Sequence, residues 1–367
     1  MKKTVFLLFV GLVLGANGWA VPADEVASLR QRLAGSGQAV TESDRGVIDR
    51  FWRIALDALL LSEDPAELVS IRLQLQQEKG TEPLNPYATA YVQTAKTHIN
   101  SAFEAVSRWA DSERKSLMDR NLMILTARLE SVLLADIGLE RLEHSDVVVR
   151  YWAAKAVANA GVARQLPSAD TATADAILNA VAARVAAETS SEILRVIVTF
   201  AGMVDHDQAR EILMAAAQRR IEIYRSWRVE NESLDTVLLK VMGQLVIAEQ
   251  NTTRRAAMAQ RFAELFSMVF QRYLADPSPL TDTQKQALLN VIVEVDNQIL
   301  SRMLGQQTAI LRAIQRPTGG LDREYEAIFG SDVGAGLLAI RLGFDYGKTP
   351  QGRAIHTPPK LPPPSRP

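Results

Sequence analysis

The chain has no cysteine among its 367 residues. This absence excludes a disulfide framework, a lipid-anchoring cysteine and thiolate chemistry. Aromatic residues are also few, at 6% of the chain, whereas alanine is abundant. Because small side chains let helices approach closely, this balance favours stacked helices over a core built on a β-sheet.

Neither sign of charge is in clear excess. The chain has 41 Lys and Arg against 42 Asp and Glu. A nucleic-acid binder needs a basic stripe that replaces the counterions around the phosphates, so this near balance argues against nucleic acid as a partner. The Gly-x-Ser-x-Gly nucleophile elbow and the His-Glu-x-x-His zinc helix are absent from the sequence as well. The sequence therefore predicts no catalytic residue, no cofactor-binding residue and no metal ligand.

Long apolar runs are missing except near the amino terminus. Residues 4–14 are mostly apolar, follow two lysines, and are too short to span a bilayer comfortably. Small residues allow cleavage after Ala20, and a second possible site follows Ala23. The pattern predicts a secretory signal peptide over residues 1–20, with an uncleaved membrane anchor as the alternative. The mature chain is then expected to be periplasmic or secreted, without a membrane span.

The rest of the sequence predicts helix after helix and no convincing strand. The clearest start is Asp64-Pro65, with an Asp cap, Pro at the first helical position and Glu67 placed to reach back to the cap amide. This helix is expected to continue toward Gly80. Apolar periodicity and start signals predict further helices over residues 43–61, 86–110, 111–134, 173–187, 207–224 and 252–274.

Four short stretches recur at a spacing of 45 residues, and each is predicted to begin a core helix. They are Ser145–Arg150, Ser190–Arg195, Asp235–Lys240 and, more weakly, Leu280–Lys285. The first three share a small or acidic opener, an apolar pair and then a base. A recurrence of this length is typical of stacked helical units, in which each helix pair buries its apolar face against its neighbours.

The first of these stretches opens the strongest helical pattern in the chain. An apolar stripe runs from Val148 to Ala160 at helical spacing. Ser145 or Asp146 is expected to cap the start of this helix, and Gly161 is expected to end it.

Asp146-Val-Val-Val-Arg150, followed by Ala153 and Ala156, resembles the inner-helix pattern of HEAT and armadillo-type repeats. The shared features are an acid, an apolar run, a base and then spaced alanines, and the spacing of 45 residues lies in the range of that class. The resemblance covers about residues 145–300. The last copy departs from the pattern, because Gln284 replaces the apolar residue before the base.

The resemblance implies an all-α fold: a right-handed α-solenoid of stacked helix pairs, preceded by an all-helical amino-terminal region. In such solenoids the acid and the base usually tie adjacent repeats together, so Asp146, Arg150 and Arg195 are expected to be structural. The predicted organisation is a signal peptide at 1–20, an amino-terminal helical region at 21–144, HEAT-like repeats at 145–314, a carboxy-terminal cap at 315–355 and a disordered proline-rich tail at 356–367.

Three local patterns admit a functional interpretation. Gly343–Thr349 resembles a phosphate-binding loop but is one residue short and lacks a preceding strand, so we interpret it as a chance match. Asp205-His206-Asp207 offers metal-ligand types, but Asp205 with Gln208 is better explained as a capping box, and adjacent residues cannot enclose an ion alone. Gly330–Gly336 is interpreted as a glycine-rich exit loop.

Residues 356–367 are rich in proline, which favours an extended, solvated polyproline-type conformation. One interpretation is a peptide that docks onto an aromatic groove of a partner. The favoured interpretation is a disordered end, because chain termini are usually untethered.

The predicted function is that of an exported scaffold or adaptor that binds protein partners in the cell envelope, since extended concave surfaces are what helical repeats offer. The alternative is a helical-scaffold envelope enzyme that uses groove carboxylates. Exposed aromatics and mixed charge on one face would favour binding. Buried, convergent Asp, Glu or His with strongly shifted pKa values would favour catalysis.

Overall fold

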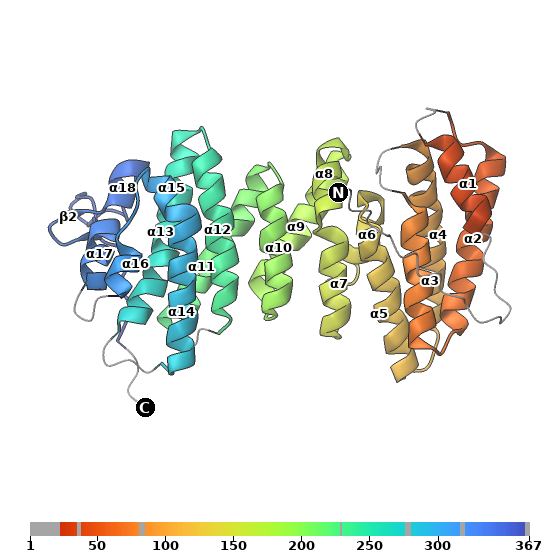
Figure 1. The fold of residues 1–367 in the computed structure, drawn as a ribbon, viewed down its shortest axis with the longest axis horizontal. Helices are drawn as coiled ribbons and strands as arrows, with labels where there is room; N and C mark the ends of the chain where they lie inside the picture. The colour runs from red at the N-terminus through yellow and green to blue at the C-terminus, as the bar shows by residue number, and fades with distance from the viewer. Residues whose placement is uncertain are drawn as a thin grey trace, which may run out of the picture. The chain divides into compact units, whose positions relative to one another are not determined.

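A computed structural model describes residues 23–34, 38–80, 85–227, 230–275, 280–315 and 320–363 of the chain. Of these residues 75% are helical and 2% lie in strands, so the predicted all-α class is confirmed. The helices pack in neighbouring pairs, as Figure 1 shows. The predicted signal peptide lies outside the described residues. Within the described part of the chain, no helix is both long enough and apolar enough to cross a membrane.

The chain folds as two compact units, Met1–Leu125 and Thr126–Pro367. The predicted boundary between the amino-terminal helices and the repeats, at residues 144 and 145, therefore lies inside the second unit. The described helices of unit 1 are α1 (Ala23–Leu33), α2 (Glu42–Leu61), α3 (Pro65–Glu78), α4 (Pro86–Ser107) and most of α5 (Glu113–Arg128).

An aromatic cluster fills the core of unit 1, where α1 to α4 pack on one another. Its rings, all buried, belong to Phe51, Trp52, Tyr87 and Tyr91. Two of the phenol groups also close helix ends, because the Tyr91 hydroxyl donates to the carbonyl of Leu75 and the Tyr87 hydroxyl donates to that of Glu78, both over 2.7 Å. The two tyrosine hydroxyls thereby satisfy carbonyls at the end of α3.

The start of α3 follows the sequence signal in part. Asp64 caps the helix by accepting from the amide of Ala66 (2.9 Å), and Pro65 occupies the first helical position. The predicted return contact from Glu67 to the cap amide is wrong. Glu67 instead accepts from the hydroxyl of Ser62 over 2.6 Å, so its carboxylate serves the residue that ends α2.

Unit 2 continues the succession of helices. Its first part contains η1 (Val132–Leu134), α6 (Ala135–Leu139), α7 (Val147–Val157), α8 (Ala160–Gln165) and η2 (Leu166–Ser168). The long helices that follow are α9 (Thr171–Ala187), α10 (Ser191–Met203), α11 (Asp207–Arg225), α12 (Glu232–Ala248), α13 (Thr252–Leu274) and α14 (Asp282–Val295). After them come the π-helical segment η3 (Asp296–Leu300), α15 (Ser301–Leu304) and α16 (Ile310–Ile314).

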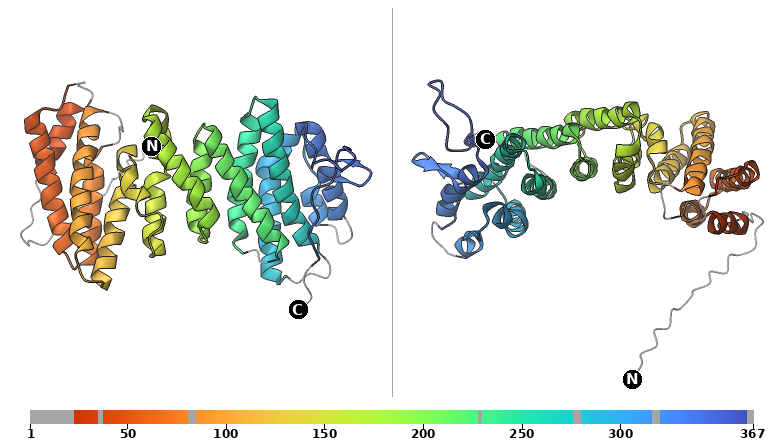
Figure 2. Two further views of the ribbon diagram at one scale, coloured as in Figure 1. Left: turned by 180° about the vertical axis from the view of Figure 1, so that it is seen from behind. Right: turned by 90° about the horizontal axis from the view of Figure 1, so that it is seen from above.

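The long helices of unit 2 form two rows. Helices α7, α10, α12 and α14 contact one another in that order, and α9, α11 and α13 form the second series. Each of α10, α12 and α14 also packs on a member of the second row. Figure 2 shows these helices from behind and from above. Each helix therefore buries one face against its own partner and another against the next pair.

The predicted end of the first repeat helix is wrong. Helix α7 stops at Val157, and Gly161 lies inside the following helix α8, whose start is capped by Asn159 accepting from the amide of Val162 (2.9 Å). A β-carbon on Gly161 would lie 2.5 Å from the carbonyl oxygen of Glu130. The glycine is required by this close approach of two backbones, not by a left-handed helix end.

The helix predicted over residues 111–134 is also too long. Helix α5 ends at Arg128, and Glu130 adopts a positive φ of 45° before the short helix η1 begins. The apolar run that predicted one helix is shared between two elements. By contrast, α13 begins and ends at the predicted residues, Thr252 and Leu274.

The carboxy-terminal part of unit 2 packs on α13. It consists of α17 (Gly320–Phe329), the paired two-residue strands β1 (Gly330–Ser331) and β2 (Gly334–Ala335), and α18 (Leu337–Leu342). Phe266 and Phe270 of α13 contact the rings of Tyr325 and Phe329 of α17. The stretch predicted as a glycine-rich exit loop therefore forms a tight antiparallel turn, anchored by aromatic packing beside it.

Candidate peptide-docking surface

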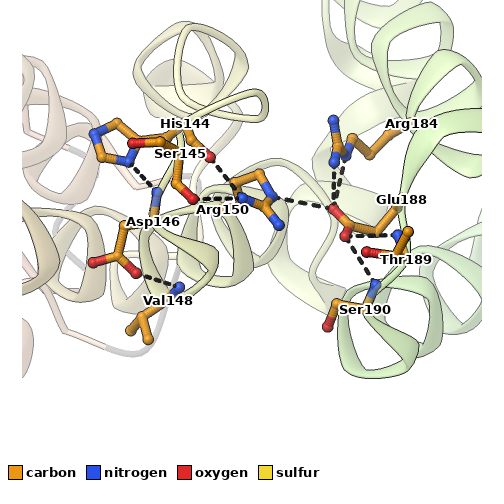
Figure 3. Close-up of polar contacts among 9 residues, drawn as sticks. All are labelled: His144, Ser145, Asp146, Val148, Arg150, Arg184, Glu188, Thr189 and Ser190. Atoms are coloured by element: carbon orange, nitrogen blue, oxygen red, sulfur yellow. Dashed lines mark hydrogen bonds and ion pairs between the residues drawn. The ribbon is translucent and has the colours of Figure 1, made fainter.

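Arg150, the base of the first repeated stretch, connects two loops of unit 2 (Figure 3). Its Nη1 donates to the carbonyl oxygens of His144 (2.8 Å) and Ser145 (2.9 Å), which precede α7. Its Nε lies 3.4 Å from Oε2 of Glu188, which follows α9. Arg150 is thus a structural brace, and Asp146 is the cap of α7, accepting from the amide of Val148 over 2.8 Å.

Glu188 is fully buried, and both of its carboxylate oxygens are occupied. Oε2 accepts from Nε (2.8 Å) and Nη2 (2.6 Å) of Arg184, while Oε1 accepts from the amides of Thr189 and Ser190, each over 2.9 Å. Burial by itself raises the pKa of Glu188, but the Ser190 amide and the two arginines outweigh it and hold that pKa below its usual value. A lowered pKa keeps the Glu188 carboxylate ionised near neutral pH, so it is not suited to act as a general acid.

The bases of the next two copies reach forward in the same way. Arg195 donates from Nη2 to the hydroxyl of Ser233 (3.0 Å) in α12, and Lys240 donates from Nζ to Glu294 (2.8 Å) in α14. All three bases therefore connect one helix pair to a later one, which is the structural role predicted for Arg150 and Arg195.

The candidate metal site divides into a helix cap and two surface ion pairs. His206, not Asp205, caps α11, because its Nδ1 accepts from the amide of Gln208 over 3.2 Å. The predicted capping box is therefore wrong: Asp205 instead pairs with Arg210 over 2.6 Å, and Asp207 pairs with the same arginine over 3.1 Å. Among the described residues, no group of three or more His, Asp or Glu side chains converges on a position for a metal ion.

The stretch that resembles a phosphate-binding loop is a hairpin. The Tyr346 amide donates to the carbonyl of Ile355 (3.0 Å), the Ile355 amide to that of Gly347 (2.8 Å), and the Thr349 amide to that of Arg353 (2.8 Å). These amides are used within the turn instead of pointing at an anion. The interpretation of Gly343–Thr349 as a chance match agrees with this geometry.

The feature that sequence reasoning missed is the position of the proline-rich tail. Gln271 on α13 grips its main chain from two sides: Nε2 donates to the carbonyl of Pro359 (2.9 Å), and Oε1 accepts from the amide of Leu361 (2.7 Å). The indole Nε1 of Trp227 donates to the carbonyl of Pro362 over 2.9 Å. Pro358 is buried. For residues 356–363 the predicted disordered end is therefore wrong, because side chains far away in sequence hold the segment.

The clamp residue Gln271 is itself held in place. Its Nε2 also donates to the hydroxyl of Ser267 (2.8 Å), one turn earlier on α13, and this hydroxyl lies 2.9 Å from that of Tyr325. Ser267 is fully buried, and burial raises the pKa of the Tyr325 phenol. The neutral chain of hydroxyls fixes the amide plane of Gln271, so that its donor and acceptor both face the tail.

The second anchor, Trp227, has an unusual backbone. Its φ is +59°, in the left-handed region that a bulky residue rarely adopts, and this conformation costs about 1–3 kcal/mol. Arg272 on α13 stabilises it, because Nη2 donates to the Trp227 carbonyl over 3.2 Å and the guanidinium lies 5.5 Å from the centre of the indole ring. In this backbone conformation the indole N–H of Trp227 points to the carbonyl of Pro362.

A buried ion cluster underlies Trp227. Asp235 is fully buried and accepts two hydrogen bonds from Arg220 (2.6 and 2.8 Å) and one from the Tyr224 hydroxyl (2.8 Å). Burial alone lowers the pKa of Arg220, but Asp235 raises it by more than burial lowers it, so the net pKa lies above the ordinary value. Asp235, which the sequence presents as the opener of the third repeat copy, thus fixes the end of α11 that leads into Trp227.

Arg272 is buried with only part of its hydrogen-bonding capacity used. Within the described part of the chain, its Nε and Nη1 have no hydrogen-bond partner, and neither does Oε1 of the neighbouring buried Glu232. Burial lowers the pKa of Arg272. The Arg272 guanidinium instead lies over two aromatic rings, 5.7 Å from the ring centre of Tyr224 and 5.5 Å from that of Trp227, so cation–π contacts stabilise its charge.

We call Trp227, Ser267 and Gln271 the tail-docking surface. Trp227 and Gln271 contact the tail through hydrogen bonds to its main chain, and Ser267 holds Gln271. An extended polyproline-type segment makes no internal hydrogen bonds, so its main-chain groups are available for such contacts. The sequence contained half of the signal, the proline-rich end. The other half, a Trp from the turn that follows α11 and a Gln from α13, becomes visible only when α11 and α13 lie together. No known protein family matches the chain, and no curated protein matches it in sequence.

Proposed function

We propose that this protein is an exported helical-repeat scaffold that binds extended segments of protein partners in the cell envelope. Its residues 145–314 would form a right-handed HEAT-like solenoid. The two rows of helices in unit 2 and the forward contacts of Arg150, Arg195 and Lys240 support that proposal.

The observation that carries the binding function is the grip of Gln271 and Trp227 on the tail main chain. Every chain has carbonyl and amide groups, so this grip does not depend on the side chains that the tail itself carries. A surface of this kind can take an extended segment of another protein.

Among the described residues, Glu188 and Asp235 are fully buried carboxylates, and neither supports the alternative, an envelope enzyme with groove carboxylates. Each accepts hydrogen bonds from an arginine and has both oxygens occupied, so neither is available as a general acid or base.

An array of extended twelve-residue peptides, some rich in proline, tests the binding function with the full chain. We expect peptides that bind the wild-type chain to lose most of their affinity for Gln271→Ala, because that variant lacks the side-chain amide that donates one hydrogen bond to the peptide main chain and accepts another. Gln286→Ala is the matched control, since Gln286 is a glutamine of α14 whose amide contacts only its neighbour Asn290 among the described residues. Equal binding by Gln271→Ala and Gln286→Ala would overturn the proposal.

Export has its own test. Protein recovered from the periplasmic fraction of expressing bacteria is expected to begin at Val21 or Asp24, which amino-terminal sequencing reads directly. Recovery of the chain with Met1 still present would contradict the proposed signal peptide.

A further inference from the structure

The order of proline and non-proline residues in the tail, its register, matches the hydrogen bonds that the tail makes. Gln271 needs one main-chain N–H, and the residue that supplies it, Leu361, is not a proline. Prolines, which have no N–H to offer, flank the pair Lys360-Leu361 on both sides: Pro358, Pro359, Pro362 and Pro363. Two of them present carbonyls that are used, at Pro359 and Pro362. The composition of the segment is therefore the one that this surface can satisfy.

Burial along the tail follows the same register. Pro358 is buried and Leu361 is half-buried, whereas Lys360 and Pro363 are exposed. A polyproline helix has three residues per turn, so residues three apart share a face. The face with Pro358 and Leu361 is turned to the protein, and the face with Lys360 and Pro363 is turned to solvent.

The surface does not depend on the tail for its shape. Ser267 and Tyr325 hold the amide of Gln271, and Arg272 with Tyr224 holds the carbonyl and ring of Trp227. None of these contacts involves residues 356–363. When the tail leaves, the donors and acceptor of Gln271 and Trp227 remain in position without a partner in the tail.

We infer that the partner of this surface is a proline-rich segment of another protein with the pattern Pro-Pro-x-Leu-Pro, and that the chain's own tail is a resident copy that the partner displaces. This inference rests on the proposed binding function and adds the class of partner and its regulation. The fourth position of the pattern must retain its N–H, the third is free, and the flanking prolines pre-form the extended backbone and so reduce the entropy lost on binding.

A tethered tail competes as if it were present at about millimolar concentration. For a partner peptide whose own dissociation constant is micromolar, such a competitor weakens the observed affinity by a factor that reaches about 10²–10³ when both segments bind equally well. Release of the tail therefore acts as a switch for the surface.

The test uses full-length chains and a fluorescent peptide with the sequence of residues 356–363, followed by fluorescence anisotropy. Leu361→Pro removes the N–H that Gln271 requires and is expected to free the surface, so this variant should bind the peptide at least tenfold more tightly than the wild-type chain. Lys360→Pro is the matched control, because it changes an exposed neighbour whose amide donates no hydrogen bond within the described residues. It should bind the peptide like the wild type.

A second peptide, with proline at the position of Leu361, tests the pattern on the Leu361→Pro chain. We expect it to lose at least tenfold in affinity relative to the first peptide. Equal affinity of the two peptides would overturn the register, and equal affinity of the wild-type and Leu361→Pro chains for the first peptide would overturn the competition. Failure of every chain to bind either peptide, together with the failure of the array above, would instead refute the proposed binding function.

Discussion

Two buried ion clusters of unit 2 differ in how completely their hydrogen bonds are satisfied. The brace cluster consists of Glu188 with Arg150 and Arg184, and both of its carboxylate oxygens accept at least two hydrogen bonds or ion pairs. The anchor cluster consists of Arg272 with Glu232, Tyr224 and Trp227, and buried atoms of Arg272 and Glu232 lack a partner within the described residues.

The difference reflects two roles. The brace cluster stabilises the fold, whereas the anchor cluster holds Trp227 in position. A buried charge with unsatisfied hydrogen-bonding atoms costs stability, and it persists where it serves another purpose. In the anchor cluster, that purpose is to support the left-handed backbone of Trp227 beneath the tail. The brace cluster has no ligand to hold and is fully satisfied.

The largest effect is expected next to the anchor cluster, at Asp235. Asp235→Ala leaves Arg220 buried without its carboxylate, and such a loss costs about 3–5 kcal/mol of the free energy of unfolding. Urea denaturation followed by circular dichroism measures it. Asp282→Ala, at the exposed start of α14, is the control and should change stability by less than about 0.5 kcal/mol. A cost for Asp235→Ala no larger than that of the control would show that the buried pair of Asp235 with Arg220 does not hold the end of α11.

The brace cluster should respond to pH as well as to mutation. Glu188→Gln removes charge-assisted hydrogen bonds and is expected to cost about 1.5–3 kcal/mol near neutral pH. Because the folded-state pKa of Glu188 lies below its ordinary value of 4.5, its stabilisation is complete above that pH and is lost as pH falls through the folded pKa. The stability difference between wild type and Glu188→Gln should therefore shrink as the pH falls below about 4. A difference that grows in acid would reverse the sign of the shift.

Arg272→Met should separate stability from binding. Replacing an incompletely paired buried ion by an apolar side chain of similar length is often neutral or stabilising, so the free energy of unfolding should change by less than about 1 kcal/mol. The Trp227 carbonyl loses its donor, however, and binding of the tail peptide should weaken. Denaturation and peptide anisotropy on the same protein test both halves. A loss of about 3 kcal/mol with unchanged binding would make Arg272 a brace like Arg150.

The smallest effect is expected for Arg195, the most exposed of the three repeat bases. Arg195 is partly exposed and contacts Ser233 and Glu192 at the surface, so Arg195→Ala should cost about 0–1 kcal/mol. The same denaturation experiment measures it. A cost as large as that of Glu188→Gln would show that the brace does not depend on burial.

Local signals in the sequence predicted local structure well. Asp64-Pro65 and the start at Thr252 were correct because a cap and its helix are neighbours in sequence, so the deciding contacts involve few residues. The prediction at Gly161 failed for the opposite reason, because Gly161 is required by the distant carbonyl of Glu130. The prediction at Asp205 failed locally: His206 caps α11, and Asp205 pairs with Arg210.

The candidate site was predictable only in part. The tail was recognisable from its prolines, and one interpretation of it was a peptide that docks onto an aromatic groove of a partner, although a disordered end was favoured. Its receptor was not recognisable, because Trp227 and Gln271 carry no motif and lie far apart in sequence, one in the turn after α11 and the other on α13. The repeated bases gave a true indication of the contacts between helix pairs, and none of them belongs to the tail-docking surface.

The sequence by itself determined the all-helical class, most helix limits and the extended character of the tail, since each depends on residues within a few turns of one another. Only the tertiary structure decided that Arg220 meets Asp235, that Arg272 supports Trp227, and that Gln271 holds the tail. These contacts join α11, α12, α13 and the last residues of the chain. Their energies depend on burial and geometry that arise only when the helices pack.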